Sequence, residues 1–225
     1  MKREEQTTTA LTIAQKYLPP AIAAEIKNLD EKAADMAALN RAAAELNPMT
    51  LATAQAVVVD HLRAALTPEI VRYIRALANT PIGFQTDRVP GKRLNKRTGQ
   101  MEEISDYPDE VYKDFAIACY SAGARMYGNE ANIIKGKLLL TKNFYFRLND
   151  EALGKENWSA RYAGIQPGDK GARVVGSLWW RDSAGEHREE RYIADVVGDR
   201  ETSGIDMYVG KWEKRAARYI YEQSS

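Results

Sequence analysis

The chain has very few of the residues that build disulfides and most zinc sites. Its 225 residues include one cysteine, Cys119, and two histidines, His61 and His187. One cysteine cannot form an internal disulfide, and a structural zinc site needs about four Cys or His ligands. Neither histidine lies in a pattern that supports a Ser-His-Asp triad. These absences exclude a disulfide-stabilised scaffold and a Cys/His zinc domain.

Long hydrophobic runs and nucleotide-binding loops are also absent. No apolar run approaches the roughly 18–20 residues of a membrane span, and no apolar segment follows the charged start Met1–Glu5. The sequence has no G-x-x-x-x-G-K-[ST] loop and no G-x-G-x-x-G after a predicted strand. We therefore expect a cytoplasmic protein that contacts no membrane and does not use ATP. Carboxylates without a recognisable spacing leave a metal-dependent nuclease as an alternative, because such sites assemble from distant residues.

Net charge is almost absent as well, but the two signs are separated along the chain. The 32 basic and 31 acidic residues give a net charge of +1. Residues 111–181 carry a net +5, residues 182–209 a net −5 and residues 210–225 a net +2. Such asymmetry marks a surface for a polyanion, or it reflects helices and strands with solvated charges.

The order of patterns predicts an α+β fold. Helices are expected over 21–46, 50–65, 67–79 and about 106–128, with residues 83–106 as a loop. Strands are expected over 133–140, 158–165, 172–181 and 186–197, with a helix or bent segment over 142–153 and a closing helix over about 208–223. We predict a helical N-terminal part followed by a small antiparallel sheet, a β-β-β-α-like core with a closing basic helix. The expected division is an N-terminal helical segment, 1–47, and a core, 48–225.

The first predicted helix carries a heptad-like stripe. Ile22, Leu29, Met36 and Ala43 are spaced by seven residues. The stripe indicates either self-association or packing of the helix on its own domain. We favour packing of the helix on its own domain. An Ala-rich stripe packs closely in either case.

The strand predicted over 172–181 alternates between two faces. Val174, Gly176, Leu178 and Trp180 form a core face, and the other face places Trp179 between Arg173 and Arg181. An aromatic ring stacks on any base while guanidinium groups hold phosphates. The alternative is that Trp179 packs under a helix and the arginines extend around it.

Two further segments concentrate positive charge. At about 100° per residue, the closing helix places its four basic residues on one stripe, apart from an apolar face that includes Trp212 and Ile220. The segment 127–148 combines lysines and Arg147 with three aromatic residues, Phe144–Phe146, and contains no acid between Glu130 and Asp150. Both segments suit a polyanion-facing surface. An aromatic core with solvated lysines would also explain the second segment.

The segment 116–138, with the sequence AIACYSAGARMYGNEANIIKGKL, resembles phage RecT/Red-beta-type single-strand annealing proteins. In that family a helix ends in a turn of small residues and leads directly into a strand. The order of the following elements is also similar, up to the helix that opens GKWEKRA at 210–216. The resemblance covers about residues 67–221 and rests on element order and weak motifs.

The resemblance implies a non-enzymatic, ATP-independent protein that needs no cofactor or metal. It would oligomerise on single-stranded DNA as a ring or filament and promote annealing through a duplex intermediate in phage recombination. A phage exonuclease and a host single-strand-binding protein are the implied protein partners, and the host bacterial cytoplasm is the implied location. The alternatives are the nuclease and a self-assembling phage structural or adaptor protein. The candidate nucleic-acid-binding residues are Lys135, Lys137, Lys142, Arg147, Arg161, Arg173, Trp179, Arg181, Lys211, Lys214, Arg215 and Arg218.

Overall fold

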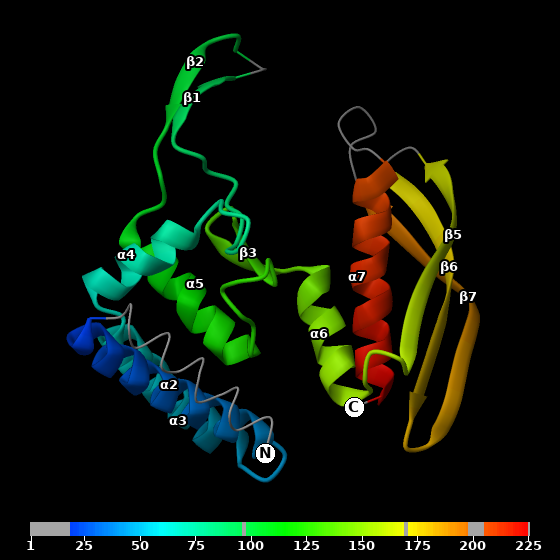
Figure 1. Cartoon of the computed structure of the whole chain (residues 1–225), viewed down its shortest axis with the longest axis horizontal. Coiled ribbons are helices and arrows are strands. Elements are labelled where there is room, and N and C mark those ends of the chain that lie inside the picture. Colours follow the sequence, from blue (N-terminus) through cyan, green and yellow to red (C-terminus); the bar gives the residue numbers. More distant parts are fainter. Residues whose placement is uncertain (1–18, 96–97, 169–170, 198–204, 225) are drawn as a thin grey trace. The chain divides into compact units, whose positions relative to one another are not determined.

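The chain folds as a mixed α+β protein, as predicted. The computed structural model describes residues 19–95, 98–168, 171–197 and 205–224. These residues form two compact units, which are considered separately (Figure 1). The first unit extends to Tyr127 and includes Asn132–Leu139; the second consists of Gly128–Ala131 and the chain from Leu140 onward. Among the described residues, no helix combines the length and apolarity that a membrane crossing requires.

Four helices form most of the described part of the first unit: α2 (Pro20–Arg41), α3 (Pro48–Ala65), α4 (Pro68–Leu77) and α5 (Asp109–Ala122). Proline begins each of α2, α3 and α4, where its missing N–H and fixed φ cost nothing. The Asn47 side chain caps α3 by accepting from the Met49 N–H at 2.9 Å. The Thr67 hydroxyl caps α4 in the same way.

The heptad-like stripe of α2 is used inside the first unit. Ile22, Leu29 and Met36 are buried, and α2 packs against α3 and α5. Helix α2 therefore belongs to the same compact unit as the helices that follow it, although the expected 1–47 segment would separate it from them. This placement agrees with packing of the stripe on its own domain.

The core face of α5 receives an aromatic contact from outside the helix. Tyr112, Phe115 and Cys119 are buried, whereas Ala122 is exposed. Phe84 packs against this face, because its ring centroid lies 4.5 Å from that of Phe115 and 6.4 Å from that of Tyr112. This aromatic contact comes from a segment that the sequence pattern assigned to a loop.

Two short hairpins correct the predicted secondary structure. The expected loop 83–106 contains strands β1 (Gly91–Leu94) and β2 (Met101–Ile104). The expected single strand 133–140 is a hairpin of β3 (Ala131–Ile134) and β4 (Lys137–Leu140). Lys135 and Gly136 both have positive φ, 54° and 73°, which is the geometry of a two-residue hairpin turn. The Asp87 carboxylate supports the turn by accepting the Lys135 N–H at 3.0 Å.

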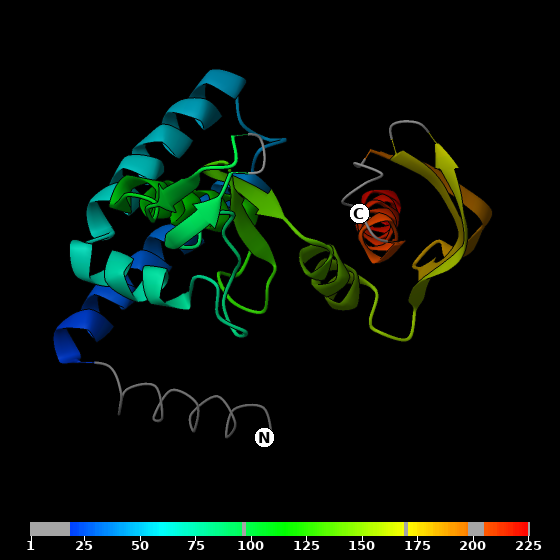
Figure 2. The same ribbon diagram turned by 90° about the horizontal axis from the view of Figure 1, so that it is seen from above.

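The second unit is a three-stranded antiparallel sheet with helices on one side. Strands β5 (Trp158–Gly168), β6 (Gly171–Asp182) and β7 (Gly185–Val197) pair in that order, and α7 (Ile205–Ser224) follows. Helix α6 (Lys142–Ala152) packs against α7. Figure 2 shows α7 end-on within the curve of the sheet. One face of the sheet is therefore covered by α7, and we call the opposite one the outer face.

The predicted core face of β6 is confirmed. Val174, Leu178 and Trp180 are buried against Trp212 and Ile220 of α7. Gly176 completes this face because a Cβ there would lie only 2.3 Å from the Trp212 ring. The absence of a side chain at residue 176 thus allows the largest aromatic residue of α7 to lie directly on the sheet.

Candidate nucleic-acid interface

Trp179 lies on the outer face, one residue before the buried Trp180. It is half-buried and pairs across the sheet with Ser159 of β5 and Arg188 of β7. The guanidinium carbon of Arg181 lies 5.8 Å from the Trp179 ring centroid. The alternation of β6 therefore places one tryptophan in the core and the next among basic residues on the outer face.

Glu186 connects the basic residues around Trp179. Its carboxylate accepts from Arg181 at 3.2 Å and from Arg188 at 2.9 Å. Hydrogen bonds from Arg181, and then from Trp179 and Arg188, hold the pKa of Glu186 below its ordinary value. Glu186 thus orients the indole and two guanidinium groups, and it also neutralises part of their charge.

A cavity of about 320 Å³ opens beside Trp179 and is more polar than apolar. Arg161, Ser159 and Ser177 line it from β5 and β6, and Arg188 and Glu190 line it from β7. Arg161 pairs across the strands with Ser177 and is exposed. Within the described part of the chain, Arg161 has no ion pair, so its guanidinium group is available to an anion.

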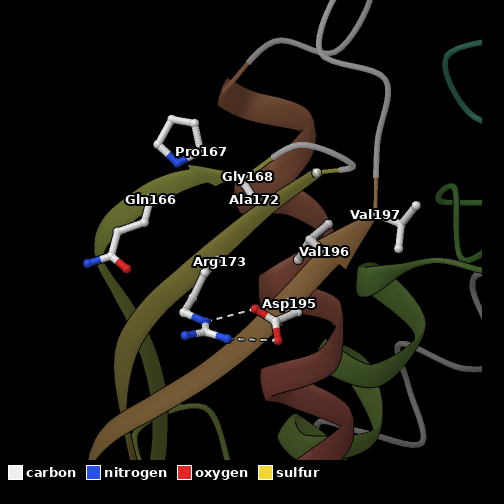
Figure 3. Close-up of a pocket in the computed structure, with 9 residues that line it drawn as sticks. Gln166, Pro167, Gly168, Ala172, Arg173, Asp195, Val196 and Val197 are labelled. Carbon is white, nitrogen blue, oxygen red and sulfur yellow. Dashed lines mark hydrogen bonds and ion pairs between the residues drawn. The ribbon is translucent and has the colours of Figure 1, made fainter.

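A second cavity, of about 440 Å³, lies at the far end of the same sheet (Figure 3). Arg173 and Asp195 pair there across β6 and β7, with Nε and Oδ1 2.9 Å apart. This pair lowers the pKa of Asp195 and raises that of Arg173. The predicted contact residue Arg173 is therefore already paired with a carboxylate from the acidic segment 182–209.

The basic stripe of α7 is separate from its core face, as expected, but most of its members have partners. Lys211 donates to the carbonyl of Val197 at 2.8 Å, and Arg215 donates to the carbonyl of Asp195. Four residues along a helix span about 6 Å, and two residues along a strand span about 6.6 Å. The spacing of the two cations therefore matches that of the Asp195 and Val197 carbonyls, two residues apart on the edge strand β7. Their side chains cover this part of the sheet edge.

The other two members of the stripe are also less available to bind an anion. Arg218 pairs with Glu222 at 2.7 Å. Lys214 is half-buried, and burial followed by the nearby charge of Arg218 lowers its pKa. In the structure the stripe fixes the helix against the sheet edge more than it offers charge to a ligand.

The remaining predicted cations lie in other surroundings. Lys142 pairs with Glu213 at 2.6 Å, and Arg147 pairs with Glu130 and Glu151 at 2.7 Å each. Lys135 and Lys137 are exposed on the β3–β4 hairpin of the first unit, whereas the other ten candidates lie in the second unit. Of the predicted set, the outer face brings Arg161, Trp179 and Arg181 together.

Arg188, Ser159 and Glu190 were not predicted. The signal for Arg188 was present, because the turn at Asp182–Gly185 pairs Arg181 with Glu186 and so aligns Trp179 with Arg188. Ser159 and Glu190 could not be placed, because β5 and β7 each contain a register shift opposite β6.

Among the described residues, no group of three or more His, Cys, Asp or Glu side chains is arranged to hold a metal ion. Comparisons with protein-family models, with curated proteins and with solved structures find no match. The function of this chain is therefore inferred from the geometry of its own residues.

Proposed function

We propose that the second unit binds single-stranded DNA on the outer face of the β5–β6–β7 sheet, and that the protein anneals complementary strands without ATP. The observation that supports this proposal most strongly is the position of Trp179. Its indole lies on the sheet face that α7 leaves open, with Arg181 and Arg188 beside it. Arg161, which forms no ion pair among the described residues, lines the adjoining cavity. The RecT-type resemblance supports the same function.

The chemistry of this face suits a single strand of any sequence. Every base has a π-face, so stacking on Trp179 tolerates sequence and contributes about 1–3 kcal/mol per base. Guanidinium groups around the ring bind phosphates, and this contribution weakens as salt rises. Because only the bases at the aromatic residue are occupied, neighbouring bases stay free to pair with a second strand.

The ion pairs of the structure rank the candidate contacts. Arg161 has no ion pair among the described residues, so a phosphate there displaces no carboxylate. Arg181 and Arg188 would have to exchange Glu186 for phosphate. Lys211 and Arg215 hold the edge of β7 and contribute less. We therefore assign the base contact to Trp179 and the first phosphate contact to Arg161.

The experiment that tests this proposal measures the fluorescence anisotropy of a labelled oligonucleotide at low salt. We expect W179A to weaken binding by roughly 5- to 150-fold, which corresponds to about 1–3 kcal/mol. R161A should weaken binding less and reduce its salt dependence. K155A is the matched control, because it removes an exposed cation from the same unit outside this face. Equal affinities for the four proteins would contradict the proposal.

Annealing needs a separate readout. Two complementary oligonucleotides with donor and acceptor dyes should pair faster with the wild-type protein than without protein, in the absence of ATP and Mg²⁺. W179A should lose most of this acceleration. An end-labelled strand incubated with Mg²⁺ or Mn²⁺ should stay intact; cleavage would favour the nuclease alternative.

A further inference from the structure

The β1–β2 hairpin of the first unit separates its charges by strand. Strand β1 contains Lys92 and Arg93, and strand β2 contains Glu102 and Glu103. The register places Lys92 opposite Glu103 and Arg93 opposite Glu102. One edge of the hairpin is therefore basic and the other is acidic.

The hairpin is short and projects into solvent. All residues of β1 are exposed, including Leu94, which is 53% exposed, and its cross-strand neighbour Met101 is 60% exposed. The two strands form a sheet of their own among the described residues, so each has one free edge. An isolated two-stranded hairpin is marginally stable in water, and further strands stabilise it.

Most charged side chains of these two strands form no ion pair with another described residue. Glu102 accepts a hydrogen bond from the Asn95 side chain at 2.6 Å. In the part of the chain that the structure describes, Lys92, Arg93 and Glu103 form no ion pair. Their charges are thus available to a partner strand of opposite sign.

From this separation we infer that the hairpin is a self-association surface, with β1 of one copy beside β2 of a second copy. Like charges directly opposite each other destabilise a strand pair, so β1 beside β1 and β2 beside β2 are both disfavoured. Pairing of β1 with β2 brings basic residues against acidic ones. It also places the exposed Leu94 and Met101 in one continued sheet.

A head-to-tail contact of this kind leaves one free edge on each side. Association through it is therefore open-ended and does not stop at a symmetric dimer. The contact involves only the first unit, and its test uses no DNA. A protein that fails to bind DNA can therefore be distinguished from a protein that fails to self-associate through the hairpin.

The first experiment measures self-association by sedimentation velocity at low salt. We expect the wild-type protein to form species larger than a monomer and K92E/R93E, in which both strands are acidic, to remain monomeric. The control is R72E, which reverses an exposed charge on α4. A monomeric wild-type protein, or a K92E/R93E variant that associates like the wild type, would overturn the inference.

The second experiment identifies which strands meet. K92C and E103C are prepared separately, mixed, and treated with a short bis-maleimide; the native Cys119 is buried, and the wild-type protein serves as its control. We expect cross-links between the two variants and few within either one alone. Cross-links of K92C to itself or of E103C to itself would overturn the head-to-tail pairing, and so would the absence of any cross-link.

Discussion

Trp179 and Trp180 are adjacent in the sequence but meet different surroundings on the two faces of one sheet. Trp180 is 5% exposed, stacks on His187 at 5.0 Å and meets Tyr219 edge-on. Trp179 is half-buried among Arg181, Arg188 and Glu186. The same side chain thus stabilises the fold on one face and is available to a ligand on the other. The difference arises because α7 covers only one face.

The largest effect should come from removing Trp180. W180A leaves a cavity between β6 and α7, so we expect a loss of about 3–5 kcal/mol in the free energy of unfolding. Urea denaturation followed by circular dichroism measures this loss. The comparison with Trp179 predicts that W179A changes the free energy of unfolding far less. Equal losses in the two variants would show that both tryptophans are structural.

A smaller loss should follow from adding one methyl group on the covered face. In G176A the new Cβ would lie 2.3 Å from Trp212 and 2.3 Å from the carbonyl of Arg161, so helix or strand must move. Overpacking of this kind costs about 1–3 kcal/mol. A thermal or urea midpoint of G176A close to that of the wild-type protein would show that α7 does not pack directly on Gly176. G164A on β5, where a Cβ meets no atom within 4 Å, is the matched control.

Three carboxylates of strands β6 and β7 should make the stability of the second unit sensitive to acid. Hydrogen bonds from His187, Arg181 and Arg173 lower the pKa values of Asp182, Glu186 and Asp195 respectively. Because these folded-state pKa values lie below the unfolded ones, the stabilisation is complete above the unfolded pKa values of about 4. It is lost as the pH falls through the lowered values. Urea midpoints across this pH range should fall, and D195N should show a shallower fall.

The smallest effect should come from Lys214. Burial lowers its pKa, so its charge is a cost to the folded state. K214M should keep the packing of the methylene chain and raise the urea midpoint slightly at neutral pH. It should leave DNA affinity almost unchanged. A large loss of affinity in K214M would return the α7 stripe to the DNA-binding surface.

The sequence was sufficient to predict elements whose periodicity is strong. The alternation of β6 separated Trp179 from Trp180, and the helical period separated Trp212 from the basic stripe. Partners distant in the sequence were not predictable. Nothing local indicates that Lys211 and Arg215 meet carbonyls of β7, or that Phe84 packs against α5. The β3–β4 turn was missed because Lys135 adopts a positive φ that is uncommon for lysine.

Photo-cross-linking tests most directly whether single-stranded DNA lies on the outer face. An oligonucleotide containing 5-iodouracil is irradiated with the wild-type protein, and the modified peptides are identified by mass spectrometry. We expect cross-links at Trp179 and at the residues beside it on β5 and β7. Cross-links confined to α7 or to the first unit would contradict it.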